Sequence, residues 1–156
     1  MIQHVALQLE VYNFSKLEVE TNFEHKANTP VPVVNVQIQF GIGPIPGLEN
    51  RYKIVLGVDH LQPANTDNEK GTLPYKIALQ VIGQFAVEPA EPDAEKLEKL
   101  LRFNGGSMLY SAAREMVLIV TGRGPWGPYA LPTVNFQTLK KVEPQPTSQL
   151  SASPPP

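Results

Sequence analysis

The run from Ser107 to Thr121, SMLYSAAREMVLIVT, constrains the fold most, because it is the best helical pattern in the sequence. Apolar residues recur in it at the spacing of one helix face, namely Leu109, Ala112, Ala113, Met116, Ile119 and Val120. From Met116 to Val120 every residue is apolar, so no side of this part of the helix suits water. A chain of 156 residues has little material to cover such a helix on two sides. We therefore expect a second subunit to cover one side.

Composition and charge exclude several classes of function. The net charge of -2 argues against broad electrostatic attraction to nucleic acid or to anionic lipid. The chain has no cysteine, so disulfides and thiolate chemistry are excluded. There is no run of about 18 apolar residues, and the N-terminus lacks a signal-peptide pattern. We expect a cytoplasmic protein without direct membrane insertion.

Four segments alternate apolar and polar residues with the period of a half-buried strand. They cover residues 5–19, 34–42, 52–58 and 75–87. A break in phase predicts a bulge or bend near Asn13, and Gly83 suggests a bulge in the last strand. Successive strands joined by turns and followed by helices predict the α+β class, with a four-stranded antiparallel meander sheet. The helix at 107–121 is expected to cover one face of that sheet.

The remaining segments are expected to be short helices, loops and a tail. Asp93 is a plausible N-cap for a short amphipathic helix that Gly105 and Gly106 would end, and Gly122 is expected to end the main helix. Asn135 is the expected N-cap of two further helical turns, from residue 136 to about residue 142. We place the domain at residues 1–143. The tail at 144–156 is rich in proline and serine and is expected to be disordered.

Nothing in the sequence predicts a catalytic or metal site. The three histidines, His4, His25 and His60, lack metal-ligand spacing. No nucleophile elbow, P-loop or dinucleotide-binding fingerprint occurs in the sequence. We therefore expect no cofactor, no metal and no enzymatic activity.

A loop rich in proline and glycine carries three aromatic residues, Trp126, Tyr129 and Phe136, beside the apolar helix. Each ring taken singly favours packing at the end of the sheet. The three together favour a groove for extended apolar segments of another chain. Arg114 and Glu115, inside the helix, form either a solvated surface spot or a partly buried ion pair at an interface.

The sequence resembles the SecB family of export chaperones. The resemblance is strongest in LYSAAREMVLIVTGRG, where six residues stand at the family's spacing: Leu109, Tyr110, Arg114, Glu115, Arg123 and Gly124. It continues to the VNF of residues 134–136, and Trp126 stands where the family carries an aromatic residue. The long first strand agrees as well.

This resemblance implies a homotetramer, built as a dimer of dimers with the main helix between two sheets. It also implies an ATP-independent holdase that binds unfolded preproteins in apolar grooves and delivers them to the SecA motor. We predict client contacts at Phe40, Ile42, Ile45, Trp126, Tyr129, Phe136 and Leu139. The oligomer interface is predicted at Leu9, Val11, Ala113, Met116, Val117 and Val120. Glu18 and Glu20 are the candidates for motor binding.

The sequence departs from the family's export members in ways that keep other functions open. Lys16 stands where an acidic residue is expected, and the tail is not acidic. A SecB-like chaperone with one dedicated client, such as an antitoxin, is therefore an alternative. Two further alternatives are an adaptor that binds a folded partner through its sheet edge, and a small-ligand enzyme or carrier.

Overall fold

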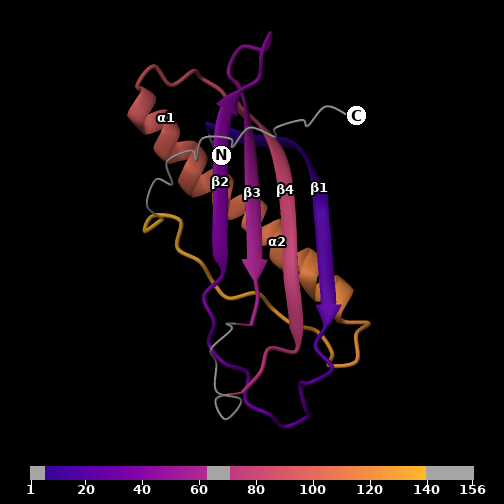
Figure 1. Cartoon of the computed structure of the whole chain (residues 1–156). Helices are drawn as coiled ribbons and strands as arrows, with labels where there is room; N and C mark the ends of the chain where they lie inside the picture. The colour runs from indigo at the N-terminus through magenta and orange to yellow at the C-terminus, as the bar shows by residue number, and fades with distance from the viewer. Residues whose placement is uncertain (1–5, 63–70, 140–156) are drawn as a thin grey trace, which may run out of the picture.

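The computed structural model describes residues 6–62 and 71–139, which form an antiparallel sheet with helices on one face (Figure 1). The strands are β1 (Leu7–Thr21), β2 (Gln37–Pro44), β3 (Arg51–His60) and β4 (Tyr75–Val87). The predicted α+β class with a four-stranded antiparallel sheet is confirmed. The strand order is β1-β4-β3-β2, so β2 to β4 form a meander while β1 pairs with β4. The connection between β1 and β2 therefore runs past the ends of β4 and β3 (Figure 1), and β1 and β2 are the two edge strands.

The core lies between the inward face of the central strands and the main helix. Every second residue of β3 and β4 is buried there, as the alternation predicts. The inward residues of these two strands include Ile54, Leu56, Val58, Ile77, Leu79, Val81 and Phe85. The edge strands are much less buried, so the core narrows toward both sides of the sheet.

Two irregularities in β1 replace the single bend expected near Asn13. The register with β4 shifts once between Leu9 and Val11 and again between Phe14 and Lys16. Each extra residue reverses which face the next side chain takes. Val11 pairs with Gln84 and faces away from the core, although strict alternation places it beside Leu9.

Gly83 does not form the expected bulge, because it pairs without a register break with Tyr12 on one side and Ile54 on the other. Its function is close packing against the main helix. A Cβ atom at this position would lie 2.7 Å from Leu109 Cδ2, closer than such contacts allow.

The two helices that we expected to be separate form one continuous helical stretch. It consists of α1 (Ala94–Leu100), the π-helix η2 (Leu101–Gly105) and α2 (Gly106–Thr121). Asp93 caps α1, since its carboxylate accepts the backbone N–H groups of Glu95 and Lys96. Gly105 and Gly106 are buried inside the stretch and do not end a helix. They are used for close packing, because a Cβ on Gly105 would lie 2.5 Å from Ile54 Cδ1.

Gly122 ends α2 as expected, and an irregular stretch follows that we call the C-terminal segment, residues 122–139. It returns from the β1 end of α2 toward the β2 side of the molecule (Figure 1). The helix expected from residue 136 is absent over residues 136–139, which form a turn. Asn135 accepts the Gln137 N–H with its side chain, a local turn that competes with helix formation. The rest of that predicted helix and the predicted tail lie outside the described residues.

Candidate functional site

Trp126 anchors the C-terminal segment at the end of the sheet where β1 finishes and β4 begins. Its indole Nε1 donates to the Asn22 carbonyl over 3.0 Å, and its backbone N–H donates to Tyr75 Oη, also over 3.0 Å. The ring of His25 meets the indole edge-on, with 5.0 Å between the ring centroids. Because both of its N–H groups are bound within the chain, Trp126 plugs the sheet end, which was the simpler of our two interpretations.

Tyr129 is tied to the same end of the sheet through His60. The Tyr129 hydroxyl and His60 Nε2 are 2.7 Å apart, and the two rings are stacked with centroids 5.7 Å apart. His60 is fully buried, which lowers its pKa, and burial also raises the pKa of Tyr129. Within the described residues, His60 Nδ1 has no hydrogen-bond partner. Tyr129 therefore holds the segment to the sheet.

Three aromatic rings meet farther along the sheet, and we call them the aromatic cluster: Phe40, Tyr110 and Phe136. Their ring centroids lie 6.3 Å apart for Phe40 and Phe136, and 5.9 Å apart for Tyr110 and Phe136. Gly106 forms the floor, because a Cβ there would come within 2.7 Å of the Phe136 ring. Tyr110 Oη donates to the Pro132 carbonyl at 2.5 Å, and burial raises the pKa of Tyr110 to about 12. The structure thus joins two predicted client residues, and adds Tyr110 to them.

The three remaining predicted client residues are Ile42, Ile45 and Leu139. Ile42 and Leu139 are half-buried against the core, and Ile45 is half-buried in the turn after β2. The Leu139 carbonyl accepts a hydrogen bond of 3.2 Å from Arg102 Nη1. A hollow of about 110 Å³ lies beside the cluster, lined by Ser107, Tyr110, Ser111, Arg114, Thr133, Val134 and Phe136. Arg114 donates its Nε–H to the Leu131 carbonyl, so it braces the C-terminal segment.

The structure divides the predicted interface residues of α2 into two sets. Ala113 and Val117 have no exposed surface, because they pack against the chain's own sheet. They are therefore core residues of the single chain, although we predicted them at the oligomer interface. Met116 is half-buried and Val120 is 38% exposed. The outer side of α2 exposes further apolar side chains that the prediction omitted: Met108, Leu118 and Ile119.

The predicted interface residues of β1 are also divided between two surfaces. Leu9 packs against the margin of the core, whereas Val11 lies on the outer face of the sheet and is 48% exposed. Two apolar residues that the sequence did not single out, Tyr12 and Leu17, pair with core positions of β4 but remain exposed. The inward face of this edge strand thus extends beyond the cover that the single chain provides.

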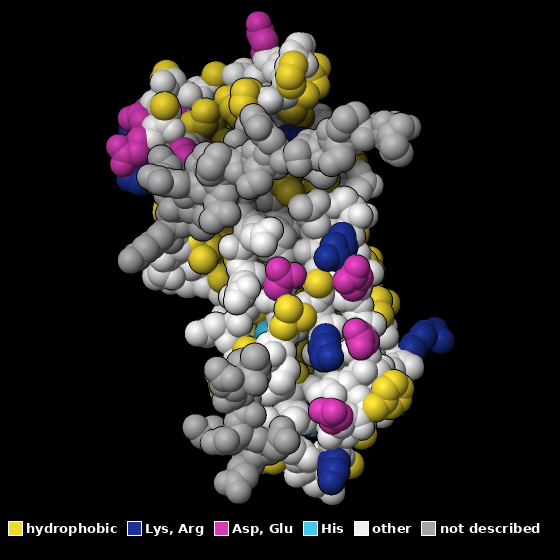
Figure 2. Space-filling model, in the orientation of Figure 1, with side chains coloured by type: hydrophobic (Ala, Val, Ile, Leu, Met, Phe, Trp, Pro, Cys, Tyr) yellow, Lys and Arg dark blue, Asp and Glu magenta, His cyan; other side chains and the backbone are white. Residues whose placement is uncertain are grey.

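Glu18 and Glu20 are exposed on the outer face of β1. Figure 2 shows side chains of both charges on this face of the molecule. Glu18 is 3.7 Å from Lys16, and Glu20 pairs across the sheet with Lys76. Both carboxylates are exposed, and the Lys16 ammonium offsets the charge of Glu18.

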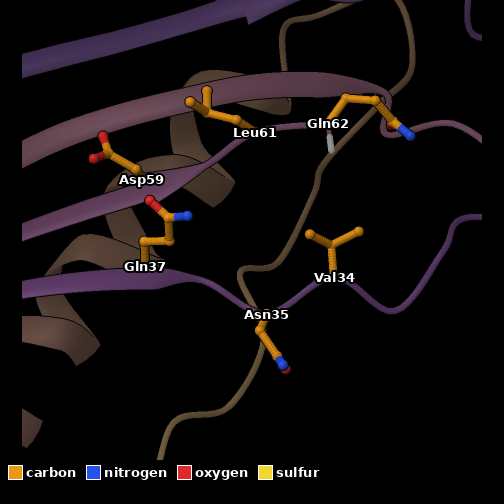
Figure 3. Close-up of a pocket in the computed structure, with 6 residues that line it drawn as sticks. All are labelled: Val34, Asn35, Gln37, Asp59, Leu61 and Gln62. Carbon is orange, nitrogen blue, oxygen red and sulfur yellow. The ribbon is translucent and has the colours of Figure 1, made fainter. Parts of the chain in front are cut away.

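A second hollow lies at the other end of β2 and has a different character (Figure 3). It has a volume of about 420 Å³ and is lined by Val34, Asn35, Gln37, Asp59, Leu61 and Gln62. The side chains of Gln37 and Asp59 lie beside each other, while Asn35 points away (Figure 3). None of the predicted client residues lines this hollow.

Over residues 6–62 and 71–139, no group of three or more His, Cys, Asp or Glu side chains is placed to hold a metal ion. In the same ranges, no helix is long and apolar enough to cross a membrane. The part of the chain that the structure describes therefore offers apolar and aromatic surface rather than a cluster of metal-ligating groups.

Comparisons with known proteins agree with this architecture. No protein-family model matches the chain. The protein-export protein SecB of Wolbachia pipientis (subsp. Culex pipiens, strain wPip) is 21% identical over 128 residues, which cover 76% of this chain and 77% of the relative.

Two solved structures are similar to the chain. A Mycobacterium tuberculosis SecB-like chaperone, in complex with a ChAD peptide from the HigA1 antitoxin, aligns with a TM-score of 0.63 and 15% identity. That alignment covers 83% of this chain and 91% of the chaperone chain. A Streptococcus agalactiae protein of unknown function aligns with a TM-score of only 0.45 and 15% identity, covering 81% of this chain and 97% of its own, and is too distant to bear on the fold. The chain therefore has the fold of the SecB-like chaperones, and its resemblance to the SecB family is confirmed.

Proposed function

We propose that the chain is an ATP-independent chaperone that holds unfolded polypeptides, including preproteins, in an extended state. The observation that carries this proposal is the aromatic cluster, in which Phe40 of edge strand β2 and Tyr110 of α2 are covered by Phe136 of the irregular C-terminal segment. The SecB relative and the SecB-like structural neighbour support a chaperone role. Holding a client in this way requires apolar contact rather than a catalytic group or a cofactor.

The side chains around the cluster suit short apolar contacts with an extended chain. β2 contains no charged residue, and its inward side chains alternate with glutamine and glycine. We keep four predicted residues as proposed client contacts, namely Phe40, Ile42, Ile45 and Leu139, while the Phe136 ring itself lies against Phe40. Trp126 and Tyr129 instead position the C-terminal segment, because their polar atoms are bound within the chain.

The exposed apolar surface of α2 supports a homo-oligomer, which we propose to be a dimer of dimers. Met108, Leu118 and Ile119 are 39%, 40% and 61% exposed, on a helix whose opposite side is fully buried. A helix that is apolar on both sides is stable in water only when both sides are covered. A second copy of the chain supplies that cover. It contacts this side of α2 and the exposed inward residues of β1, Tyr12 and Leu17.

Light scattering tests the proposed function directly. The purified protein is mixed, without nucleotide, with a reduced and permanently unfolded polypeptide, and with the native form of the same polypeptide as control. We expect a complex with the unfolded form alone, on a particle of tetramer mass. Binding to neither form would refute a general holdase, and binding to the native form would favour an adaptor for folded proteins.

A chaperone dedicated to one client, such as an antitoxin, is the second candidate. The structural neighbour of this fold was solved with an antitoxin peptide, and Lys16 lies beside Glu18 on the surface proposed for SecA. Delivery to SecA predicts that the motor co-sediments with the chain, and that Glu18→Lys and Glu20→Lys abolish this binding. Binding of one polypeptide among many unfolded ones, without the motor, would favour the dedicated chaperone.

A further inference from the structure

The two halves of the C-terminal segment are fastened to the body of the protein in different ways. The first half, residues 122–132, is held by hydrogen bonds to side chains of the sheet and of α2. These bonds reach the backbones of Trp126, Gly127, Tyr129, Leu131 and Pro132. Five backbone positions are thus fixed by side chains that are themselves buried or half-buried. We refer to this half as the pinned half.

The second half, residues 133–139, has almost no hydrogen bonds to the rest of the chain. Asn135 accepts from Gln137 and Thr138, and these bonds stay inside the segment. Among the described residues, the bond from Arg102 Nη1 to the Leu139 carbonyl is the one that reaches the body. We refer to this half as the strap. Its most buried side chain is that of Phe136, while Val134 and Leu139 are only half-buried against the core.

Phe136 is only 3% exposed although it lies on an irregular segment. Its ring fills a space whose walls belong to other elements, with Phe40 on β2 and Tyr110 on α2. The floor is the bare Cα of Gly106. A ring from a weakly held strap thus occupies a site built by rigid elements. The arrangement resembles a bound aromatic side chain more than a core residue.

We call the space between Phe40, Tyr110 and Gly106 the aromatic site. We propose that Phe136 of the strap occupies this site as a placeholder, and that an aromatic side chain of an extended polypeptide displaces it. This inference rests on the proposed function and adds a regulation of the same site. Because the Phe136 ring packs against Phe40 and Tyr110, the competing side chain should be an aromatic ring of similar size. The hollow beside the cluster, bounded by Val134 and Ser111, gives the incoming side chain a place next to the ring that it replaces.

Removing the placeholder should strengthen client binding. In a placeholder mechanism, the apparent affinity is the intrinsic affinity reduced by the fraction of molecules with an open site. If about a tenth of the molecules are open, Phe136→Ala lowers the apparent Kd for an unfolded, aromatic-rich peptide about tenfold. Phe136→Leu, which retains an apolar side chain, should lie between the two. The matched control is Phe40→Ala, which removes a wall of the site and should weaken binding.

Fluorescence anisotropy with a labelled peptide measures these three affinities. Weaker or unchanged binding by Phe136→Ala, beside weaker binding by Phe40→Ala, refutes the placeholder while leaving the chaperone role intact. Binding by none of the proteins, wild type included, refutes the proposed function, and the placeholder with it.

Hydrogen exchange without any client gives an independent test of the strap. The backbone amides of residues 133–139 should exchange faster than those of Trp126 and Tyr129, which donate to side chains of the body. Phe136→Ala should accelerate exchange in the strap and leave the pinned half unchanged. Equal protection in both halves, or acceleration throughout the segment, would show that Phe136 is an ordinary core residue.

Discussion

Two substitutions two residues apart on α2 should have different effects, one on stability and one on association, and they test where the chain's own core ends. Val117 is fully buried against the sheet, while Ile119 is 61% exposed. Val117→Ala removes two buried carbon groups, worth about 0.8 kcal/mol each. The remaining cavity brings the loss in free energy of unfolding to about 2–3 kcal/mol. For a chain of this size, the melting temperature should fall by roughly 5–10 °C.

Ile119→Asp should leave the single chain stable but dissociate the oligomer. A change at an exposed position alters the free energy of unfolding of the single chain by less than about 0.5 kcal/mol. In an interface the same change buries an unpaired carboxylate, at a cost of several kcal/mol. A loss of about 3 kcal/mol weakens association roughly a hundredfold.

Two measurements separate these effects. Urea unfolding at a protein concentration below the Kd of the oligomer reports the stability of the single chain, and sedimentation velocity at a higher concentration reports the particle mass. Val117→Ala should lower the free energy of unfolding even in the single chain, whereas Ile119→Asp should reduce the particle mass. An unaltered mass for Ile119→Asp would remove this side of α2 from the interface. Unaltered stability for Val117→Ala would show that α2 does not pack on the sheet through this face.

Three further predictions concern the core and the helix start. Burial lowers the pKa of His60 in the folded chain, so the unfolded chain binds more protons in acid. The free energy of unfolding should therefore be highest above about pH 6.5, the pKa of an unperturbed histidine, and should fall below that pH. Urea unfolding at several pH values should show this fall for the wild type and not for His60→Gln. Gly83→Ala should cost about 1–3 kcal/mol, because its Cβ would collide with Leu109, and thermal unfolding that matches wild type would contradict this packing. Asp93→Ala should cost about 1 kcal/mol by removing the cap of α1, while Asp93→Asn should retain most of the stability in the same assay.

The strand pattern was readable from the sequence because period-two alternation survives wherever pairing is regular. β4 begins and ends at the residues that the alternation indicated, Tyr75 and Val87. In β1 the alternation misplaced Val11, since each register shift reverses the faces of all later residues. Pairing of β1 with β4 rather than β2 was also unreadable, because alternation specifies faces and not neighbours.

The site was only partly predictable, because the partners of its polar atoms are distant in sequence. Trp126 and Tyr129 were predicted as client contacts, because nothing local shows that the Asn22 carbonyl and His60 bind their polar atoms. Tyr110 gave a weak signal, since it flanks the buried helix stripe with an aromatic ring. An aromatic residue beside such a stripe, facing a proline-rich loop, is the pattern that would have found it.

The glycine pair explains both the error in the helix boundary and the origin of the aromatic site. In isolation, Gly105–Gly106 costs helix stability, which is why the sequence indicated a helix end. Tertiary packing overrides that cost, because each missing Cβ lets a large side chain approach the helix backbone. At Gly106 the side chains that approach are Phe40 and Phe136. Gly106→Ala should therefore leave the helix able to form but expel one ring, so the residue that weakens the helix pattern is the one that makes room for the aromatic cluster.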